Sequence, residues 1–177
     1  MGKNTIATKW TGDAESYTPE KYIEMAREVM GSIDTDPASN DLAQKVVKAE
    51  KYYTIDNTSL TETWKGNIFL NPPYSRGVID KFIHKLIEEL DDTKQAILLT
   101  NNNTDTIWFN LAATKCDSIC FTKGRINFYK ADGSKTSPTN GQTFFYFGSN
   151  IDKFSKIFND IGLIMKVVKH DKISKYF

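Results

Sequence analysis

The sequence has few of the residues on which metal, redox and acid–base chemistry usually depend. It contains two cysteines and two histidines in 177 residues. Cys116 and Cys120 have no further ligands at metal-site spacing, so we expect no metal site and two reduced, half-buried packing residues within or beside a strand. The scarcity of histidine, found only at His84 and His170, favours chemistry that needs no tuned general base.

Long apolar runs and a strong charge imbalance are also lacking. No segment is apolar enough to cross a bilayer or resembles a signal peptide, so we expect a cytoplasmic protein without membrane contact. The net charge is only +1, so no overall field points to nucleic acid, and any binding to DNA must rest on local clusters. The length of 177 residues predicts one domain, residues 1–177, with a sizeable core.

What the sequence does show is a regular alternation of apolar patterns. Thr18 as an N-cap and Pro19 at the first helical position predict a helix that ends before Gly31. Further helices are predicted at 39–51, 76–90, 105–114 and 152–161, and strands at 32–36, 67–70, 96–100, 119–121, 126–129, 143–147 and 163–168. This alternation predicts an α/β fold, with a mostly parallel sheet and helices on both faces. The polar loop 130–142 predicts an antiparallel hairpin between its flanking strands, near an edge of the sheet.

Residues 68–75, Ile-Phe-Leu-Asn-Pro-Pro-Tyr-Ser, join a buried strand to a rigid polar turn. Two successive prolines fix φ and remove two backbone donors, so the chain must leave the sheet as a stiff, extended segment. Its free carbonyls lie next to the amide of Asn71 and the ring of Tyr74. Such a set suits a planar amino group, with two acceptors for its N–H bonds and a ring on which to stack. The alternative is that the segment is only a strand-ending turn.

The tetrapeptide Asn71-Pro72-Pro73-Tyr74 resembles the catalytic motif of S-adenosylmethionine-dependent amino-methyltransferases. A wider series of segments looks like the phage-type (Dam-like) DNA N6-adenine methyltransferase family. These segments are Tyr17-Thr18-Pro19, Ile33-Asp34-Thr35-Asp36-Pro37-Ala38-Ser39, Trp64-Lys65-Gly66-Asn67, the turn itself, Gly124-Arg125-Ile126-Asn127-Phe128 and Phe145-Tyr146-Phe147-Gly148. The resemblance implies a Rossmann-like class I methyltransferase fold, S-adenosyl-L-methionine as cofactor, and adenine in double-stranded DNA as the methyl acceptor.

The chemistry expected of the turn follows from the electronics of the adenine amine, whose lone pair is delocalised into the ring. If the Asn71 side-chain oxygen and the Pro72 carbonyl accept its two hydrogen bonds, electron density builds up on nitrogen for in-line attack on a sulfonium methyl. Tyr74 would hold the base by stacking, worth about 1–3 kcal/mol. Adenine within a duplex is out of reach of such a turn, so base flipping is implied.

Candidate cofactor contacts lie at the first helix, beyond the first predicted strand, and near a possible strand end before residue 60. They are Tyr17, Thr18, Pro19, Asp34, Asp36, Ser39 and Asp56. Ligands of open α/β sheets bind beyond the carboxyl ends of strands, where a carboxylate can accept from ribose hydroxyls or the methionyl ammonium. Each candidate has a structural alternative, such as helix capping for Asp36 or a turn role for Asp56. The usual Gly-x-Gly loop of methyltransferases is absent, and Asp-Pro-Ala-Ser-Asn-Asp stands there instead.

Cations around the turn are candidate DNA contacts. They are Arg76, Lys123, Arg125, Lys130 and Lys135. Arg76 directly follows the turn and can reach a phosphate beside the extruded nucleotide, while the others predict a basic rim. Residues 133–141 suit groove contact, or form only a solvated loop. A chain of this length leaves little room for a separate recognition domain, so DNA readout is expected to be brief or assisted by a homodimer.

Three other functions remain open. The same turn serves methyl transfer to protein glutamine, and RNA adenine is a further possible acceptor. The glycine-poor cofactor loop is also compatible with a non-catalytic nucleic-acid-binding module on the same fold. The third is a purely structural or interaction protein. For a methyltransferase of DNA, the resemblance implies the cytoplasm of a bacterial or phage-infected host cell.

Overall fold

A seven-stranded sheet forms the centre of the computed structural model, which describes residues 16–57, 59–75 and 77–169. The strands are β1 (Thr35–Asp36), β2 (Lys51–Tyr52), β3 (Gly66–Leu70), β4 (Thr93–Asn101), β5 (Ser118–Thr122), β6 (Gln142–Phe147) and β7 (Gly162–Lys166). Their order across the sheet is β2-β1-β3-β4-β6-β5-β7. The first three pairings are parallel and the last three antiparallel, so the described sheet is mixed rather than mostly parallel.

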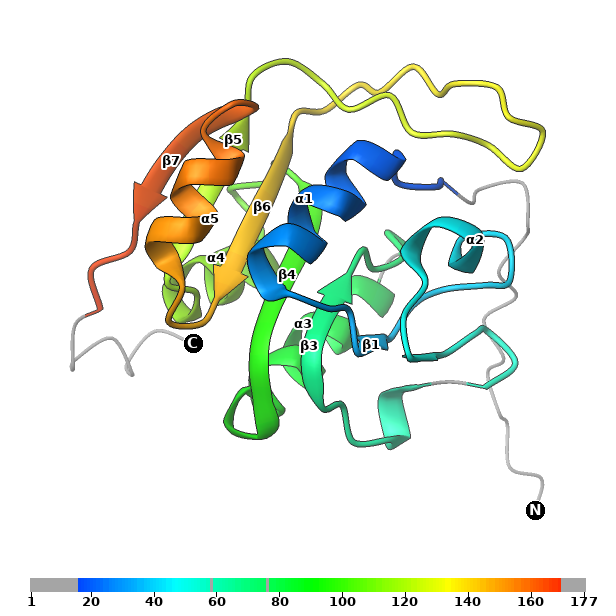
Figure 1. Cartoon of the computed structure of the whole chain (residues 1–177), viewed down its shortest axis with the longest axis horizontal. Coiled ribbons are helices and arrows are strands. Elements are labelled where there is room, and N and C mark those ends of the chain that lie inside the picture. The colour runs from blue at the N-terminus through cyan, green and yellow to red at the C-terminus, as the bar shows by residue number, and fades with distance from the viewer. Residues whose placement is uncertain (1–15, 58, 76, 170–177) are drawn as a thin grey trace.

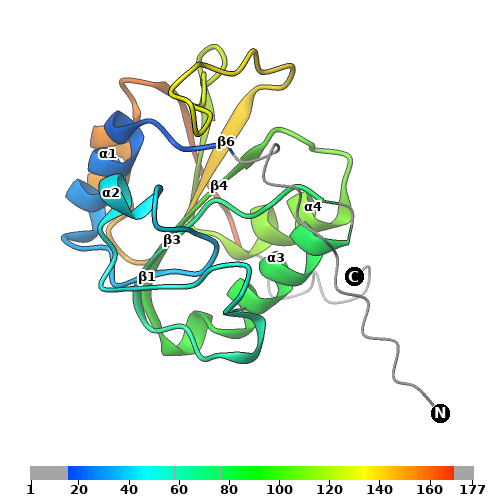
Figure 2. The ribbon, with the colours of Figure 1, turned by 90° about the vertical axis from the view of Figure 1, so that its right-hand side faces the viewer.

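Helices cover both faces of the sheet, as the alternation predicts (Figure 1). They are α1 (Glu20–Met30), α2 (Gln44–Val47), α3 (Val78–Glu88), α4 (Ile107–Lys115) and α5 (Ile151–Phe158), with short 3-10 turns at Ser59–Thr61 and Leu90–Asp92. Figure 2 shows α1 on one side of the sheet and α3 and α4 on the other. The neighbouring residues Phe144 and Phe145 of β6 point to opposite faces and pack in the two separate cores. Within the described residues, no helix has the length and apolar character that a membrane span requires.

The order of the strands places two chain segments side by side. From β1 the chain moves outward to β2, then returns to form β3 on the other side of β1. The strand order therefore reverses between β1 and β3, the kind of position where open α/β sheets bind ligands beyond the carboxyl ends of their strands. Asp36 ends β1, and Asn71 directly follows β3. The topology thus brings the two most distinctive polar positions of the sequence to one edge of the sheet.

The predicted hairpin between residues 126–129 and 143–147 is wrong, whereas antiparallel pairing near an edge of the sheet is confirmed by β5 and β7. Residues 126–129 form no strand and contribute only isolated bridges, from Tyr129 to Tyr17 and to Lys135. β6 instead lies inside the sheet, antiparallel to both β4 and β5, while β7 is at the edge. Ile126 and Phe128 are buried in the core beside α1. Their alternation with polar residues therefore reflects packing of a loop and not strand pairing.

Several predicted boundaries also shift. The helix predicted at 39–51 is reduced to the four residues of α2, and the chain leaves it through Lys48 in a left-handed conformation, φ 48°. α1 begins at Glu20, with Pro19 as its N-cap and without a side-chain cap bond, so Thr18 does not cap it. The strand predicted at 32–36 contains only its last two residues as β1. Cys116 and Cys120 are unpaired thiols, as predicted, but fully buried.

Candidate active site

Asn71 stands at the end of β3 with its side-chain amide held at one end only. Its Nδ2 donates to Thr18 Oγ1 at 3.2 Å. Its Oδ1 is buried and accepts no hydrogen bond from any described residue. Buried acceptors are nearly always satisfied, because leaving one unpaired costs about 1–3 kcal/mol. Among the described residues, this acceptor is therefore desolvated and unpaired.

The rest of the turn combines a buried stem with an accessible ring. Pro72 is buried and Pro73 half-buried, whereas Tyr74 is 40% exposed. Burial of the hydroxyl raises the pKa of Tyr74, and a backbone hydrogen bond from Asn101 offsets part of that effect. The Tyr74 hydroxyl therefore stays protonated at neutral pH, while part of the residue remains exposed. A neutral ring fixed at its polar end is suited to stacking on a planar group.

Asp36 forms a second buried polar centre, at the carboxyl end of β1. It is 3% exposed. Its carboxylate accepts from the Ala38 backbone N–H at 3.3 Å and from Gln44 Nε2 at 2.9 Å, and the same Nε2 donates to Ser39 Oγ at 2.7 Å. Desolvation raises the pKa of Asp36 to about 6, although the bonds from Ser39, Ala38 and Gln44 act in the opposite direction. At neutral pH the site holds an incompletely compensated negative charge, which favours a cationic ligand.

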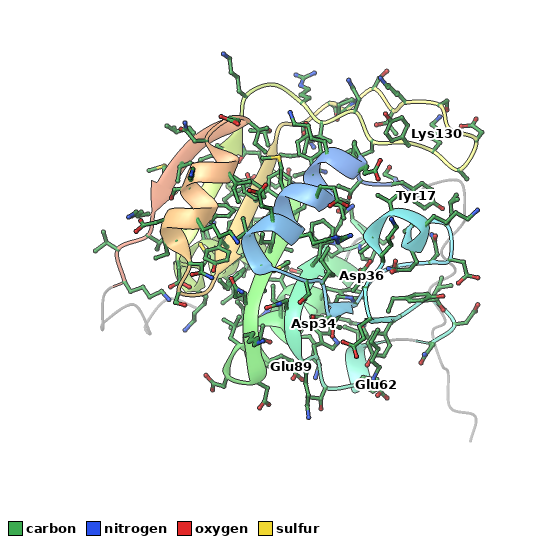
Figure 3. All side chains as sticks on the ribbon, in the orientation of Figure 1. Tyr17, Asp34, Asp36, Glu62, Glu89 and Lys130 are labelled. Atoms are coloured by element: carbon green, nitrogen blue, oxygen red, sulfur yellow. The ribbon has the colours of Figure 1, made fainter. Side chains whose placement is uncertain are left out.

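Asp34 does not lie where the sequence predicts. It precedes β1, and so it is at the opposite end of this strand from Asp36, as the labels in Figure 3 show. Its carboxylate accepts from Ser32 Oγ at 2.6 Å and from the Asn67 backbone N–H at 2.8 Å. Gly66, with φ 76°, leaves room for it, since a Cβ there would come within 2.2 Å of Asp34 Oδ2. Asp34 therefore links the starts of β1 and β3. It precedes β1 because that strand contains only residues 35 and 36 and not the predicted 32–36.

The segment before α1 links the two polar centres to the loop after β5. Tyr17 pairs with Tyr129 through two backbone hydrogen bonds, of 2.8 and 3.0 Å. Its hydroxyl accepts from Asn40 Nδ2 at 3.1 Å, which ties it to the turn after β1. This double attachment places Thr18 against Asn71. Asp56 is exposed in the loop that follows β2, and β2 runs parallel to β1.

Four of the five predicted DNA contacts lie on a loop along the same edge of the sheet. Residues 123–141 run from β5 across the top of the molecule in Figure 1 before entering β6. Lys123, Arg125, Lys130 and Lys135 on this loop are all exposed. A small hairpin holds the last two, closed by the Lys130 N–H bond to the Ser134 carbonyl at 2.8 Å. Arg76 lies outside the described residues.

Sequence reasoning missed polar residues at the ends of neighbouring strands. Asn101 hydrogen-bonds to Tyr74 through its backbone. Asn102 Oδ1 accepts from Thr143 Oγ1 at 3.1 Å, which joins the ends of β4 and β6. The available signal was the run of three asparagines, 101–103, directly after an apolar strand. Gln44, the partner of Asp36, gave no such signal because it lies in a helix whose extent was overestimated.

Comparison of the sequence with known proteins relates the chain to a family of enzymes. The sequence profile of the family described as DNA N-6-adenine-methyltransferase (Dam) matches residues 5–175. A protein of Escherichia phage T1 named DNA N-6-adenine-methyltransferase is 34% identical over 97 residues, which are 54% of this chain and 39% of the phage protein. The matched part is thus well under half of that relative's length. Since the profile covers almost the whole sequence, this chain belongs to the DNA N-6-adenine-methyltransferase (Dam) family.

Proposed function

We propose that this chain is an adenine-specific DNA methyltransferase, which uses S-adenosyl-L-methionine to methylate the N6 amine of adenine. Family membership supports the reaction. The structural observation that carries the proposal is Asn71 Oδ1, a buried acceptor without a partner among the described residues, at the end of β3. An exocyclic amine supplies the donor that this oxygen lacks.

The residues of the turn act on the amine by accepting hydrogen bonds. Asn71 Oδ1 and the Pro72 carbonyl take its two N–H bonds and draw the nitrogen toward tetrahedral geometry. Both bonds strengthen as positive charge develops on nitrogen, so they stabilise the transition state more than the ground state. Thr18 would fix the direction of the Asn71 amide, because its hydroxyl accepts from Asn71 Nδ2 and leaves the side-chain oxygen of Asn71 for the base. The product ammonium is acidic and loses its proton to solvent.

The exposed ring of Tyr74 holds the flipped base. Target adenine must leave the duplex to reach a turn at the edge of the sheet. Stacking on an aromatic ring is worth about 1–3 kcal/mol per base and repays part of the unstacking energy. The backbone hydrogen bond from Asn101 to the Tyr74 hydroxyl would hold the ring in position, and the 40% exposure of the residue supports a stacking role.

The residues at the end of β1 fit the cofactor. When bound, S-adenosyl-L-methionine supplies an electrophilic sulfonium methyl group. The incompletely compensated carboxylate of Asp36 suits the methionyl ammonium, with Ser39 beside it. Tyr17, Thr18 and Pro19 would cover the cofactor, and Asp56 would accept from ribose hydroxyls. We leave Asp34 out of this site, since its carboxylate joins β1 to β3.

A Rossmann-like class I arrangement is part of the proposal. The parallel set β2-β1-β3-β4, with its reversal between β1 and β3, supports it. The proposed partner is double-stranded DNA, contacted by Arg76, Lys123, Arg125, Lys130 and Lys135, within the cytoplasm of a bacterial or phage-infected cell. A homodimer would extend a short recognition surface.

The test is methyl transfer from labelled cofactor to unmethylated duplex DNA, with RNA and a glutamine-containing peptide offered separately. We expect label in N6-methyladenine of DNA. Asn71→Ala should lower turnover by at least about 10²–10³-fold, the usual cost of one hydrogen-bonding group at a reacting centre. The cofactor affinity and the melting temperature of this variant should stay close to those of the wild type. Asn159→Ala, on the exposed end of α5, is the matched control. Label in RNA or peptide alone would contradict the proposal.

A further inference from the structure

A cleft of about 160 Å³ opens at the carboxyl end of β5, apart from the residues already discussed at β1 and β3. Lys21 and Tyr22 of α1 line one side, the turn 122–126 another, and Asp160 and Ile161 the third. Two segments about 100 residues apart thus bring three cations, Lys21, Lys123 and Arg125, to one hollow that holds a single carboxylate.

The positive charge of this cleft is only partly offset by the protein, through the Asp160 carboxylate and the Tyr22 ring, whose centroid lies 5.8 Å from Lys21 Nζ. None of its three cations forms an ion pair with an acidic group of the described residues. Arg125 donates one bond, to the Pro138 carbonyl at 3.2 Å, and retains its other N–H groups. The backbone that carries the cations is fixed, since the Lys123 N–H donates to the Ile161 carbonyl at 2.7 Å and Thr122 Oγ1 to the Gly124 carbonyl at 3.0 Å.

The place of the cleft relates it to the reactive turn. β5 runs in the same direction as β3 and β4, so its carboxyl end lies on the same edge of the sheet as Asn71. Three strand spacings of about 4.8 Å separate β3 from β5, which gives roughly 14 Å along that edge. The major groove of DNA is about 12 Å wide, so the two positions can contact one duplex across a groove. S-adenosyl-L-methionine carries no phosphate and is expected at β1.

We propose that this cleft binds a backbone phosphate of the DNA substrate, with Lys21, Lys123 and Arg125 as its contacts. The proposal rests on the DNA-methyltransferase function proposed above. It adds Lys21, a residue of the first helical turn that no sequence pattern marked. It also assigns Lys123 and Arg125 to one defined anion position, separate from the hairpin that carries Lys130 and Lys135.

The salt dependence of DNA binding tests the cleft directly. Affinity for a short unmethylated duplex would be measured between about 50 and 200 mM salt, a range over which phosphate contacts make affinity fall steeply. Each phosphate contact contributes about 0.9 to the slope of log affinity against log salt. For Lys21→Gln combined with Lys123→Gln, we expect the slope to fall by about one and affinity at low salt to drop several-fold. The loss should appear in the KM for DNA.

Lys94→Gln is the matched control, since Lys94 is exposed at the opposite, amino end of β4. An unchanged slope in the double variant, or an equal fall in Lys94→Gln, would overturn the proposal. A further arm uses inorganic phosphate. If phosphate binds the wild type and not the double variant, while DNA affinity is the same in both, the cleft holds a free anion and the proposal is wrong. The proposed function survives that outcome, because methylation of DNA by the wild type is measured separately.

Discussion

Replacing Asp36 with asparagine should stabilise the fold at neutral pH. Burial raises the pKa of Asp36 from 3.8 to about 6, so the folded protein binds the proton more tightly than the unfolded chain. The contribution of protonated Asp36 to the free energy of unfolding is therefore fully present below about pH 4 and is lost as the pH rises through 6. At 1.36 kcal/mol for each pKa unit, the ionised carboxylate costs about 3 kcal/mol at pH 7. Asparagine avoids that cost but loses the bond from Gln44, worth about 1 kcal/mol.

The expected net gain is therefore about 2 kcal/mol at pH 7, which raises the melting temperature by roughly 4–8 °C in a protein of this size. At pH 4 the gain should disappear, since the wild-type group is then protonated. Thermal and urea unfolding at several pH values measure both, with the exposed Asp91→Asn as control. Cofactor affinity should fall in Asp36→Asn, and in the wild type it should rise between pH 5 and 7. Stability curves that stay parallel at every pH would refute the reasoning.

Two further predictions concern the turn. Thr18→Val should lower kcat by roughly 10- to 100-fold in single-turnover assays, because the Asn71 amide loses its hydrogen-bond partner and small misplacements of reacting groups are costly. Thr18→Ser should restore most of the rate. An equal loss in both variants would contradict a positioning role for the Thr18 hydroxyl. Tyr74→Ala should weaken binding of DNA that contains a target site by about 1–3 kcal/mol. Tyr74→Phe should bind almost normally, and a loss as large as that of alanine would show that the hydroxyl, and not the ring, is required.

The parts of the fold that rest on local pattern could be predicted. β3 and β4 are apolar runs bounded by polar turns, and α3 has one wide apolar stripe, so periodicity was sufficient for each. The position of β6 between β4 and β5 could not be predicted, because antiparallel pairing with a strand about 40 residues earlier leaves no mark in a local window. Ile126 and Phe128 give this loop the alternating pattern of a strand, because both side chains are buried in the core beside α1.

The residues of the candidate site could be proposed from the sequence, whereas their connections could not. Asn71 and Tyr74 were identifiable because two prolines isolate them at the end of a buried strand. The bond between Asn71 and Thr18 joins residues 53 positions apart, and the Thr-Pro pair suggested a helix cap instead. Asp34 was misplaced since a two-residue strand cannot be delimited from sequence, so the two aspartates of one short motif were expected at the same end.

The central claim is that Asn71 Oδ1 accepts a hydrogen bond from the amine that is methylated. Single-turnover methylation of duplex DNA by the wild type, Asn71→Ala and Asn71→Asp, with base-resolved detection of N6-methyladenine, tests it most directly. Aspartate keeps an acceptor and can take a hydrogen bond from the Thr18 hydroxyl, so it should retain far more activity than alanine, which keeps neither. Methylation by Asn71→Ala at a rate close to that of the wild type would contradict the claim.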